Sequence, residues 1–156
     1  ALNAGAKDVV SVDVSKTATD LMDKNMALTK HAAKHLSVTA NVMEYLKSEE
    51  VPMYDIVIID PPAFAKSINK RHNAVQAYKR LNALALTKVK TGGLLFTFSC
   101  SQVVGTQLFY DTIVAAAIEA GRKIRVMRHL SQGADHPVNL FHPEGHYLKG
   151  LMLEVS

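Results

Sequence analysis

The chain has 156 residues, of which 48% are hydrophobic and 21% are charged. This balance is typical of one globular domain with a buried core, and it excludes a disordered chain. The sequence has no apolar run long enough to cross a membrane, no signal-peptide pattern and only one cysteine, which cannot form an internal disulfide. We therefore expect a cytoplasmic protein that does not use a membrane.

The basic residues are concentrated in the middle of the chain. No acidic residue occurs between Asp60 and Asp111, and the sequence outside this segment carries a net charge of −3. The positive residues of the segment are Lys66, Lys70, Arg71, Lys79, Arg80, Lys88 and Lys90. Such a local field suits a polyanion such as nucleic acid, and a solvated helix face is the alternative interpretation.

Short β-branched runs alternate with helical patterns, which predicts an α/β fold with a largely parallel sheet. Residues 1–5 resemble the last turn of a helix that ends at Gly5, so we expect the chain to be a fragment that lacks preceding elements. The expected elements that follow are a strand over 9–13, a helix capped by Ser15, a strand over 38–40, a helical turn over 43–46 and a strand over 56–59. The last of these is an uninterrupted β-branched run, which predicts burial on both faces.

The second half continues the same alternation. A helix is expected over 73–89, a break at Gly92-Gly93, a strand over 94–98, a helix over 106–120 that ends at Gly121, and two strands over 124–128 and 147–155. We expect the last two strands to pair antiparallel and the segment 131–145 between them to form an ordered loop.

Three expected strands end in an acidic or nucleophilic residue, where open α/β sheets bind their ligands. Asp13 could accept hydrogen bonds from the hydroxyls of a ribose, or could cap the following helix. Asp60 is held by Pro61 and Pro62, which would present rigid acceptors to an amino-bearing base. The alternative interpretation of this segment is a stiff structural turn.

Side chains after Asp60 could extend such a site to nucleic acid. Phe64 could stack on a base, and Lys66 could meet a phosphate. Cys100 lies between Ser99 and Ser101, a polar setting in which a thiolate could add to an electrophilic ring carbon. A small buried hydrophobic residue is the alternative interpretation of this cysteine.

The seven histidines do not predict a metal site. His31 and His35 have an i,i+4 helical spacing, but no third ligand of a suitable type lies nearby in the sequence. We therefore expect no bound metal and solvated helix positions for this pair.

Several segments in order resemble one known family. The segments are 58–67 (IIDPPAFAKS), 78–82 (YKRLN), 92–95 (GGLL), 99–101 (SCS), 134–138 (ADHPV) and 143–150 (PEGHYLKG). Together they resemble the C-terminal catalytic domain of the ribosomal large-subunit RNA (cytosine-5-)-methyltransferase I family, over essentially the whole chain.

The resemblance implies a Rossmann-like class I methyltransferase sheet that binds S-adenosylmethionine, parallel with an antiparallel C-terminal strand. It implies that residues 1–156 form a single, N-terminally truncated domain that lacks the first strand and its glycine-rich loop, between the strands that end at Asp13 and Asp60. We expect this chain alone to bind the cofactor weakly. The implied partner is large-subunit (23S) rRNA, and the oligomeric state is left open, a homodimer included.

The resemblance also implies roles for individual residues. The cofactor would be bound by Asp13 and Val14 at its ribose, by Asn41 and Val42 at its adenine, and by Asp60 and Pro61 beside the methyl group. Most relatives have Asp where Asn41 stands, so we expect an altered adenine contact. The implied RNA-binding residues are Pro62, Phe64, Lys66, Arg71, Lys79 and Arg80.

The implied reaction is covalent. Cys100 would add to C6 of a cytosine while Asp60 orients the ring. Ala63 stands where other RNA cytosine-5 methyltransferases carry a second cysteine for product release, so this step needs another group. Two alternatives remain: methylation of a guanine nitrogen with Cys100 incidental, and a non-catalytic RNA-binding module. A nicotinamide oxidoreductase is disfavoured because no glycine-rich fingerprint precedes Asp13.

Overall fold

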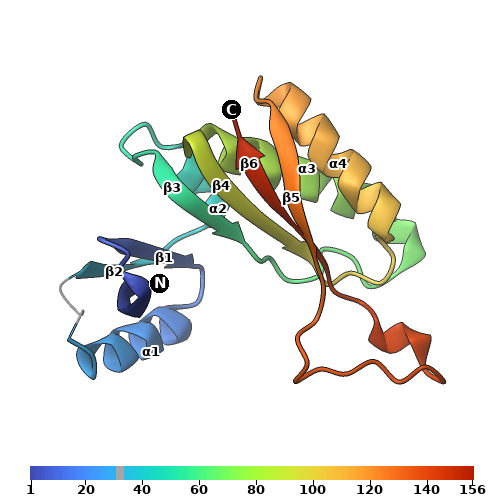
Figure 1. Cartoon of the computed structure of the whole chain (residues 1–156), viewed down its shortest axis with the longest axis horizontal. Coiled ribbons are helices and arrows are strands. Elements are labelled where there is room, and N and C mark those ends of the chain that lie inside the picture. The colour runs from blue at the N-terminus through green and yellow to red at the C-terminus, as the bar shows by residue number, and fades with distance from the viewer. Residues whose placement is uncertain (31–33) are drawn as a thin grey trace. The chain divides into compact units, whose positions relative to one another are not determined.

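The computed structural model describes residues 1–30 and 34–156. The chain divides into two compact units, Ala1–Val51 and Pro52–Ser156. Each unit has its own small sheet, with strand order β1-β2 in the first and β3-β4-β6-β5 in the second (Figure 1). The organisation of residues 1–156 as a single domain stays a prediction.

The first unit is built on a parallel strand pair. Strand β1 (Val9–Asp13) pairs with β2 (His35–Thr39), and these strands are joined and followed by α1 (Lys16–Ala27) and α2 (Val42–Lys47). Before β1, the 3-10 turn η1 (Leu2–Ala4) ends at Gly5, whose φ of 98° is left-handed. This confirms the helical turn expected at residues 1–5.

Two sequence expectations for this unit have different outcomes. Ser15 caps α1 as predicted, because its side chain accepts a hydrogen bond from the backbone N–H of Ala18. The solvated helical pair of histidines is wrong: His35 begins β2, and its ring bonds the Ser11 hydroxyl of β1 across 3.0 Å. His31 lies outside the described residues.

The second unit is a four-stranded mixed sheet covered by two helices. Strands β3 (Tyr54–Ile59) and β4 (Val89–Ser99) are parallel, and β6 (Lys149–Val155) runs antiparallel to both β4 and β5 (Ile124–Leu130). Helices α3 (Arg71–Thr87) and α4 (Thr106–Glu119) pack against each other beside this sheet (Figure 1). The predicted antiparallel pairing of the last two strands is confirmed.

The alternation of burial along the strands identifies the covered face of the second sheet. The core of this unit is formed by side chains of the sheet and of the two helices. Its fully buried members include Tyr78, Leu81, Leu86, Leu95, Phe109, Ile113 and Leu153. The prediction that residues 56–59 are buried on both faces is wrong, because Ile56 and Ile58 are 54% and 66% exposed while Ile59 is buried. In the described structure, β3 is the edge strand of this sheet, and Ile56 and Ile58 alternate with the covered positions.

The predicted break at Gly92-Gly93 is also wrong. Helix α3 ends at Thr87, and β4 begins at Val89 and continues through both glycines. Gly92 has a left-handed φ of 79°, and the pairing of β3 with β4 shifts register between Tyr54 and Ile56. The glycines therefore form an irregularity within the strand, where a β-bulge needs small residues.

Gly93→Ala should destabilise this unit. An added Cβ would lie 2.8 Å from the backbone oxygen of Asp55 and 2.9 Å from that of Lys90, so the backbone must move. We expect a loss of about 1–3 kcal/mol in the free energy of unfolding, as for overpacked core positions. Urea unfolding of Gly93→Ala beside Gly105→Ala, whose added Cβ meets nothing within 4 Å, measures the effect. Equal losses in the two variants would contradict the close approach seen at Gly93.

The segment between β5 and β6 is a loop with one 3-10 turn, η4 (Pro143–Gly145). The Gln132 side chain ties its two ends together, donating to the Gly145 carbonyl at 2.7 Å and accepting from the Leu148 backbone at 3.4 Å. This fits the expectation of an ordered loop. None of the helices over residues 1–30 and 34–156 is long and apolar enough to span a bilayer.

Candidate active site at the ends of β3 and β4

The parallel pairing of β3 with β4 brings two predicted site residues to one edge of the second sheet. Ile59, the last residue of β3, is paired with Thr97 near the end of β4. Asp60 and Cys100 directly follow these strands, so both leave the sheet at its carboxyl edge. Asp60 is exposed and Cys100 is half-buried, which leaves the carboxylate accessible and the thiol partly covered.

Two contacts connect the end of β4 to the loop that follows Asp60. The Cys100 thiol points to the carbonyl of Pro61 at an Sγ–O distance of 4.0 Å, a weak hydrogen bond. The buried Ser101 hydroxyl donates to the carbonyl of Ala65 at 3.0 Å. The two proline residues therefore belong to a loop held against Cys100, which favours a built site over an isolated stiff turn.

Tyr78, in α3, forms the buried wall beside this loop. Its ring meets Phe64 edge-on at a centroid distance of 4.7 Å, and it meets Phe109 of α4 at 5.7 Å. Burial raises the pKa of the phenol above its ordinary value of 10.0, an effect that the nearby Ser99 hydroxyl opposes and the charges of Cys100 and Asp60 reinforce. Tyr78 is thus a neutral phenol at physiological pH, placed beside both predicted catalytic groups.

Phe64 is therefore not a free stacking platform. The Phe64 side chain is half-buried, and its ring already packs against the ring of Tyr78. A base could reach the ring only on the side away from that contact.

Lys149, the first residue of β6, is a buried cation beside Cys100. It is paired with Ser99 across β4 and β6, is only 8% exposed, and donates through Nζ to the Ser101 carbonyl at 2.6 Å. Burial lowers the pKa of Lys149 below its ordinary 10.5, and the charge of the Cys100 thiolate acts in the opposite direction. The Lys149 ammonium and the Cys100 thiol are thus electrostatically coupled.

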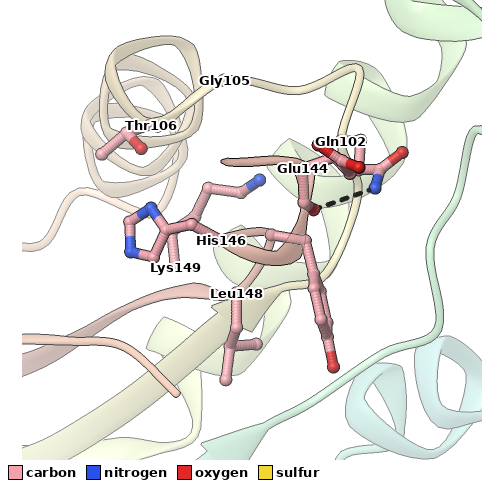
Figure 2. A pocket seen from close by; sticks show the side chains of 8 residues that line it. Gln102, Gly105, Thr106, Glu144, His146, Leu148 and Lys149 are labelled. Atoms are coloured by element: carbon pink, nitrogen blue, oxygen red, sulfur yellow. Dashed lines mark hydrogen bonds between the residues drawn. The ribbon is translucent and has the colours of Figure 1, made fainter. Parts of the chain in front are cut away.

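Lys149 also forms part of the wall of a pocket of about 280 Å³. Gln102, Glu144 and His146 line the same pocket, together with Gly105 and Thr106 at the start of α4 (Figure 2). Gln102 donates to the Glu144 carbonyl at 3.2 Å, which connects the segment after Cys100 to the loop before β6.

The basic residues of the middle segment have different environments. Lys79 forms an ion pair with Glu119 of α4 at 2.6 Å, and Lys90 pairs with Asp55 of β3 at 3.0 Å. Lys79 is therefore not a free cation for RNA. Within the described ranges, no ion pair involves the exposed residues Lys66, Lys70, Arg71 and Arg80. Three of these, Lys66, Lys70 and Arg71, lie in the segment that leads from the Asp60 loop into α3.

In the first unit, the carboxyl ends of β1 and β2 carry the predicted ribose and adenine residues. The carboxylate of Asp13 accepts from the Ser15 backbone at 2.7 Å, and the carbonyl of Asp13 accepts from the Ala40 backbone at 3.0 Å. Asn41 is the N-cap of α2, where its side-chain oxygen accepts from the Met43 backbone at 2.9 Å. Both predicted residues thus also have local structural roles, and Val42, the first residue of α2, is half-buried.

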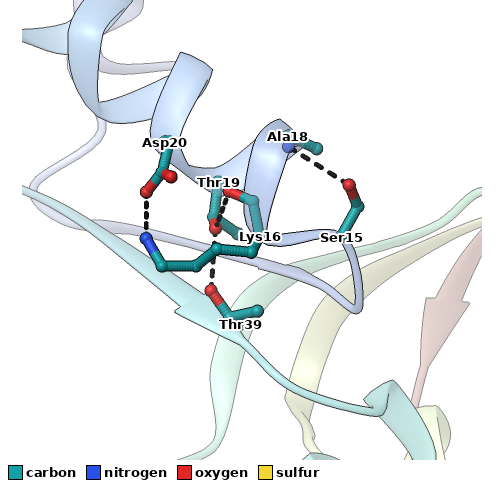
Figure 3. Close-up of polar contacts among 6 residues, drawn as sticks. All are labelled: Ser15, Lys16, Ala18, Thr19, Asp20 and Thr39. Carbon is teal, nitrogen blue, oxygen red and sulfur yellow. Dashed lines mark hydrogen bonds and ion pairs between the residues drawn. The ribbon is translucent and has the colours of Figure 1, made fainter.

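The segment after Asp13 is fixed by its own polar contacts. The hydroxyl of Thr19 in α1 bonds that of Thr39 in β2 at 2.7 Å, and Lys16 pairs with Asp20 along the helix (Figure 3). Val14, between Asp13 and the cap residue, is 75% exposed. One Asp13 carboxylate oxygen accepts from the Ser15 backbone, which leaves the other oxygen and the exposed Val14 side chain for a ligand.

Two residues of the site were given no role by the sequence: Tyr78 and Lys149 stood only within the family segments 78–82 and 143–150. A signal for Lys149 was present. The buried residues of β6 recur with a period of two at Leu151, Leu153 and Val155, and Lys149 has the same phase. A charged residue at an inward position of a strand predicts either a paired charge or a functional one.

The described histidines, cysteine and acidic residues form no group of three that could hold a metal ion. In the loop before β6, His136 lies 3.7 Å from Asp135 and His142 lies 3.5 Å from Glu144, as isolated pairs.

Comparison with known proteins places this architecture. SMU.776, assigned as a methyltransferase and solved with SAH, superposes with a TM-score of 0.79 at 24% identity, covering 96% of this chain and 40% of that one. A protein from Streptococcus mutans assigned as a SAM-dependent methyltransferase gives 0.78 at 24% identity, covering 96% and 39%. Ribosomal RNA large subunit methyltransferase I of Alteromonas mediterranea is 40% identical over 100% of this chain.

The sheet, its helices and these superpositions define an α/β methyltransferase fold, which confirms the predicted fold class. The chain belongs to the family described as conserved hypothetical protein 95, whose model matches residues 1–95. It spans about 40% of the length of the curated relatives it matches.

Proposed function

We propose that this chain forms the catalytic part of an S-adenosylmethionine-dependent rRNA methyltransferase, which methylates C5 of a cytosine in large-subunit (23S) rRNA. The observation that carries the proposal is the placement of Asp60 and Cys100 at one edge of the second sheet, with the thiol against the loop that follows Asp60. The relatives named ribosomal RNA large subunit methyltransferase I support the rRNA substrate.

The proposed reaction uses Cys100 as a nucleophile. The thiolate adds to C6 of the cytosine, a C–S bond forms, and the electron pair of the C5–C6 bond makes C5 nucleophilic. The cofactor supplies the methyl group that C5 takes up. A base then removes the C5 proton, the C5–C6 double bond re-forms and the thiolate leaves. Cys100 is half-buried at a polar strand end, which is suitable for a group that must be both protected and reactive.

Asp60 is proposed to orient the base. Its carboxylate is exposed and makes no ion pair with any residue the structure describes, so its oxygens are available to the N3/N4 edge of a cytosine. Pro61 and Pro62 restrict the backbone behind it and so limit the positions that the carboxylate can take. A cytosine in a duplex would first have to leave the stack to reach this edge.

The residues at the ends of β1 and β2 have donors and acceptors that fit S-adenosylmethionine. Asp13 has a carboxylate oxygen left over for ribose hydroxyls, and the Asn41 amide can still meet the adenine amino group. SMU.776, solved with SAH, supports this choice of cofactor. We propose that Asp13, Val14, Asn41 and Val42 hold its nucleoside, with Asp60 and Pro61 at the methyl-transfer edge.

The exposed cations after the Asp60 loop are proposed to meet the RNA backbone. Lys66, Arg71 and Arg80 are exposed and unpaired among the described residues, so they can reach phosphates. Lys79 is left out of this group because it pairs with Glu119. Pro62 and the free side of Phe64 would then face the base.

Nucleoside mass spectrometry tests the proposal. The open reading frame that encodes this chain is deleted from its host, and digested 23S rRNA from the deletion and complemented strains is compared. We expect one 5-methylcytidine to disappear on deletion and to return on complementation. Loss of a methylguanosine instead would establish the alternative acceptor. Unchanged rRNA, with binding that falls steeply with salt, would establish a non-catalytic RNA-binding module.

A further inference from the structure

We propose that Lys149 is the positioning residue that stabilises the Cys100 thiolate, with its ammonium group as the counter-ion of the sulfur. This inference rests on the proposed function, since it explains how the nucleophile of that reaction is kept in its reactive form. Lys149 has no role in the reaction proposed above, which uses Cys100 and Asp60.

The first argument is the fixed position of the Lys149 ammonium. Lys149 of β6 lies opposite Ser99 of β4, and Ser99 is the residue before Cys100. Its Nζ donates to the carbonyl of Ser101, one residue after Cys100, at 2.6 Å. Ser101 is in turn anchored to Ala65 by its hydroxyl. The lysine thus bridges the backbone on both sides of the cysteine.

The second argument is the missing counter-ion. A buried ammonium is costly unless an anion or several acceptors compensate it, and Lys149 is only 8% exposed. In the described part of the chain, no carboxylate lies within ion-pair distance of Lys149, and Glu144 of the adjoining pocket pairs instead with His142. The Ser101 carbonyl satisfies one of the three N–H groups.

The third argument is that the charge coupled to Lys149 is that of Cys100. Burial lowers the pKa of the lysine, and the opposing contribution comes from the Cys100 thiolate. A positive charge fixed on the backbone that flanks a cysteine favours the anionic form of the sulfur, and this is the role we assign to the Lys149 ammonium. Loss of the thiol proton to solvent breaks the S–H bond and leaves the anionic sulfur beside an ammonium that is already present, so no co-reactant is needed.

The other titratable groups near this pair do not replace Lys149. The charges of Cys100 and of Asp60, after β3, both act on Tyr78, in α3, but neither Asp60 nor Tyr78 can supply a positive charge. Glu144 and His146 come from the loop before β6 and share the pocket with Lys149 (Figure 2). Glu144 would weaken the positive field at the sulfur, and a neutral His146 would leave it unchanged.

The test is the pH dependence of Cys100 alkylation by iodoacetamide, a neutral reagent, on the 156-residue chain. The sequence has one cysteine, so the adduct mass reports Cys100 alone. In Lys149→Met, we expect the midpoint pH of alkylation to rise by about one unit, as expected for loss of an opposite charge nearby. Lys149→Arg should keep the midpoint close to that of the wild type. Lys123→Met removes an exposed lysine from the same unit and should leave it unchanged.

Thermal unfolding of each variant checks that the alkylation midpoints are compared between folded proteins. Because the pKa of Lys149 is lowered on folding, the unfolded chain binds more protons between the folded pKa and 10.5, and the buried ammonium costs stability that is fully present below that window. Lys149→Met should therefore be at least as stable as the wild type at neutral pH, and its advantage should shrink as the pH rises to 10.5. If Lys149→Met does not fold, Lys149→Gln, which keeps a neutral donor for Ser101, takes its place.

The same midpoint in the wild type and in the folded neutral variants would overturn the inference and leave Lys149 as a structural tie. Alkylation needs neither RNA nor a methyl donor, so its outcome is separate from that of the proposed function. A raised midpoint in a protein that methylates no cytosine would refute the function and keep the ion pair. An unchanged midpoint in a protein that does methylate cytosine would refute only the role of Lys149.

Discussion

Cys100→Ala should abolish methyl transfer to rRNA, with a loss of at least about a thousand-fold, because a covalent mechanism has no path without its nucleophile. Among the described residues, the thiol at the end of β4 makes one hydrogen bond, the weak contact to the Pro61 carbonyl, so the substitution removes little that holds the fold. The measurement is methyl incorporation into rRNA from a strain lacking the modification, by protein expressed from the full open reading frame that encodes this chain.

A second readout isolates the covalent step. RNA containing 5-fluorocytosine should trap the wild type as an adduct that survives denaturing electrophoresis, because fluorine at C5 blocks the elimination that frees the sulfur. Cys100→Ala should give no adduct, and Cys100→Ser, which keeps the size and polarity of the side chain, should behave like the alanine variant. Full activity in Cys100→Ala would end the covalent mechanism and leave the cysteine as a small part-buried side chain.

Asp60→Ala should lower kcat/KM for RNA by about a hundred-fold to ten-thousand-fold, the usual range for a group that positions or protonates the reacting base. Asp60 is exposed and the core ends at Ile59, so we expect no loss of stability. Asp60→Asn keeps one carbonyl acceptor for the cytosine amino group and should retain more activity than the alanine variant.

The matched control is Asp55→Ala in β3, the strand that Asp60 directly follows. Asp55 is an exposed aspartate whose partner is Lys90, and a surface ion pair of this kind is worth about 0–1 kcal/mol. Asp55→Ala should therefore leave methyl transfer unchanged. Equal losses in Asp55→Ala and Asp60→Ala would mean that the effect comes from the strand and not from the carboxylate at its end.

The amino-acid order by itself determined the elements and the edge at which the site lies. The β-branched run at residues 56–59, stopped by Pro61 and Pro62, identified a strand followed by an acid. The cap at Ser15 was predicted because capping is a contact between residues three apart. Strand ends of this kind point to one edge of a parallel sheet, so Asp60 and Cys100 could be named together.

The sequence predicted burial and strand continuity less well, because these properties depend on which other elements pack against a residue. Gly92 and Gly93 were taken as a break because glycine ends helices, whereas the register shift against β3 places them inside β4. Ile56 and Ile58 have the composition of doubly buried residues, but in the described structure β3 is an edge strand and their faces are open. Burial depends on what packs against a strand, and a local pattern does not contain that information.

The partners of the charged and aromatic residues were likewise decided by the tertiary structure. Lys79 of α3 forms an ion pair with Glu119 of α4, and the Phe64 ring packs on Tyr78. Lys79 and Phe64 are therefore less available to RNA than their sequence positions suggested. Lys149 is separated from Cys100 by nearly fifty residues, and only the antiparallel register of β4 with β6 brings them together. The sequence determined which groups could react, and the long-range strand pairing decided which charge lies beside the thiol, because electrostatic coupling depends on distance in space.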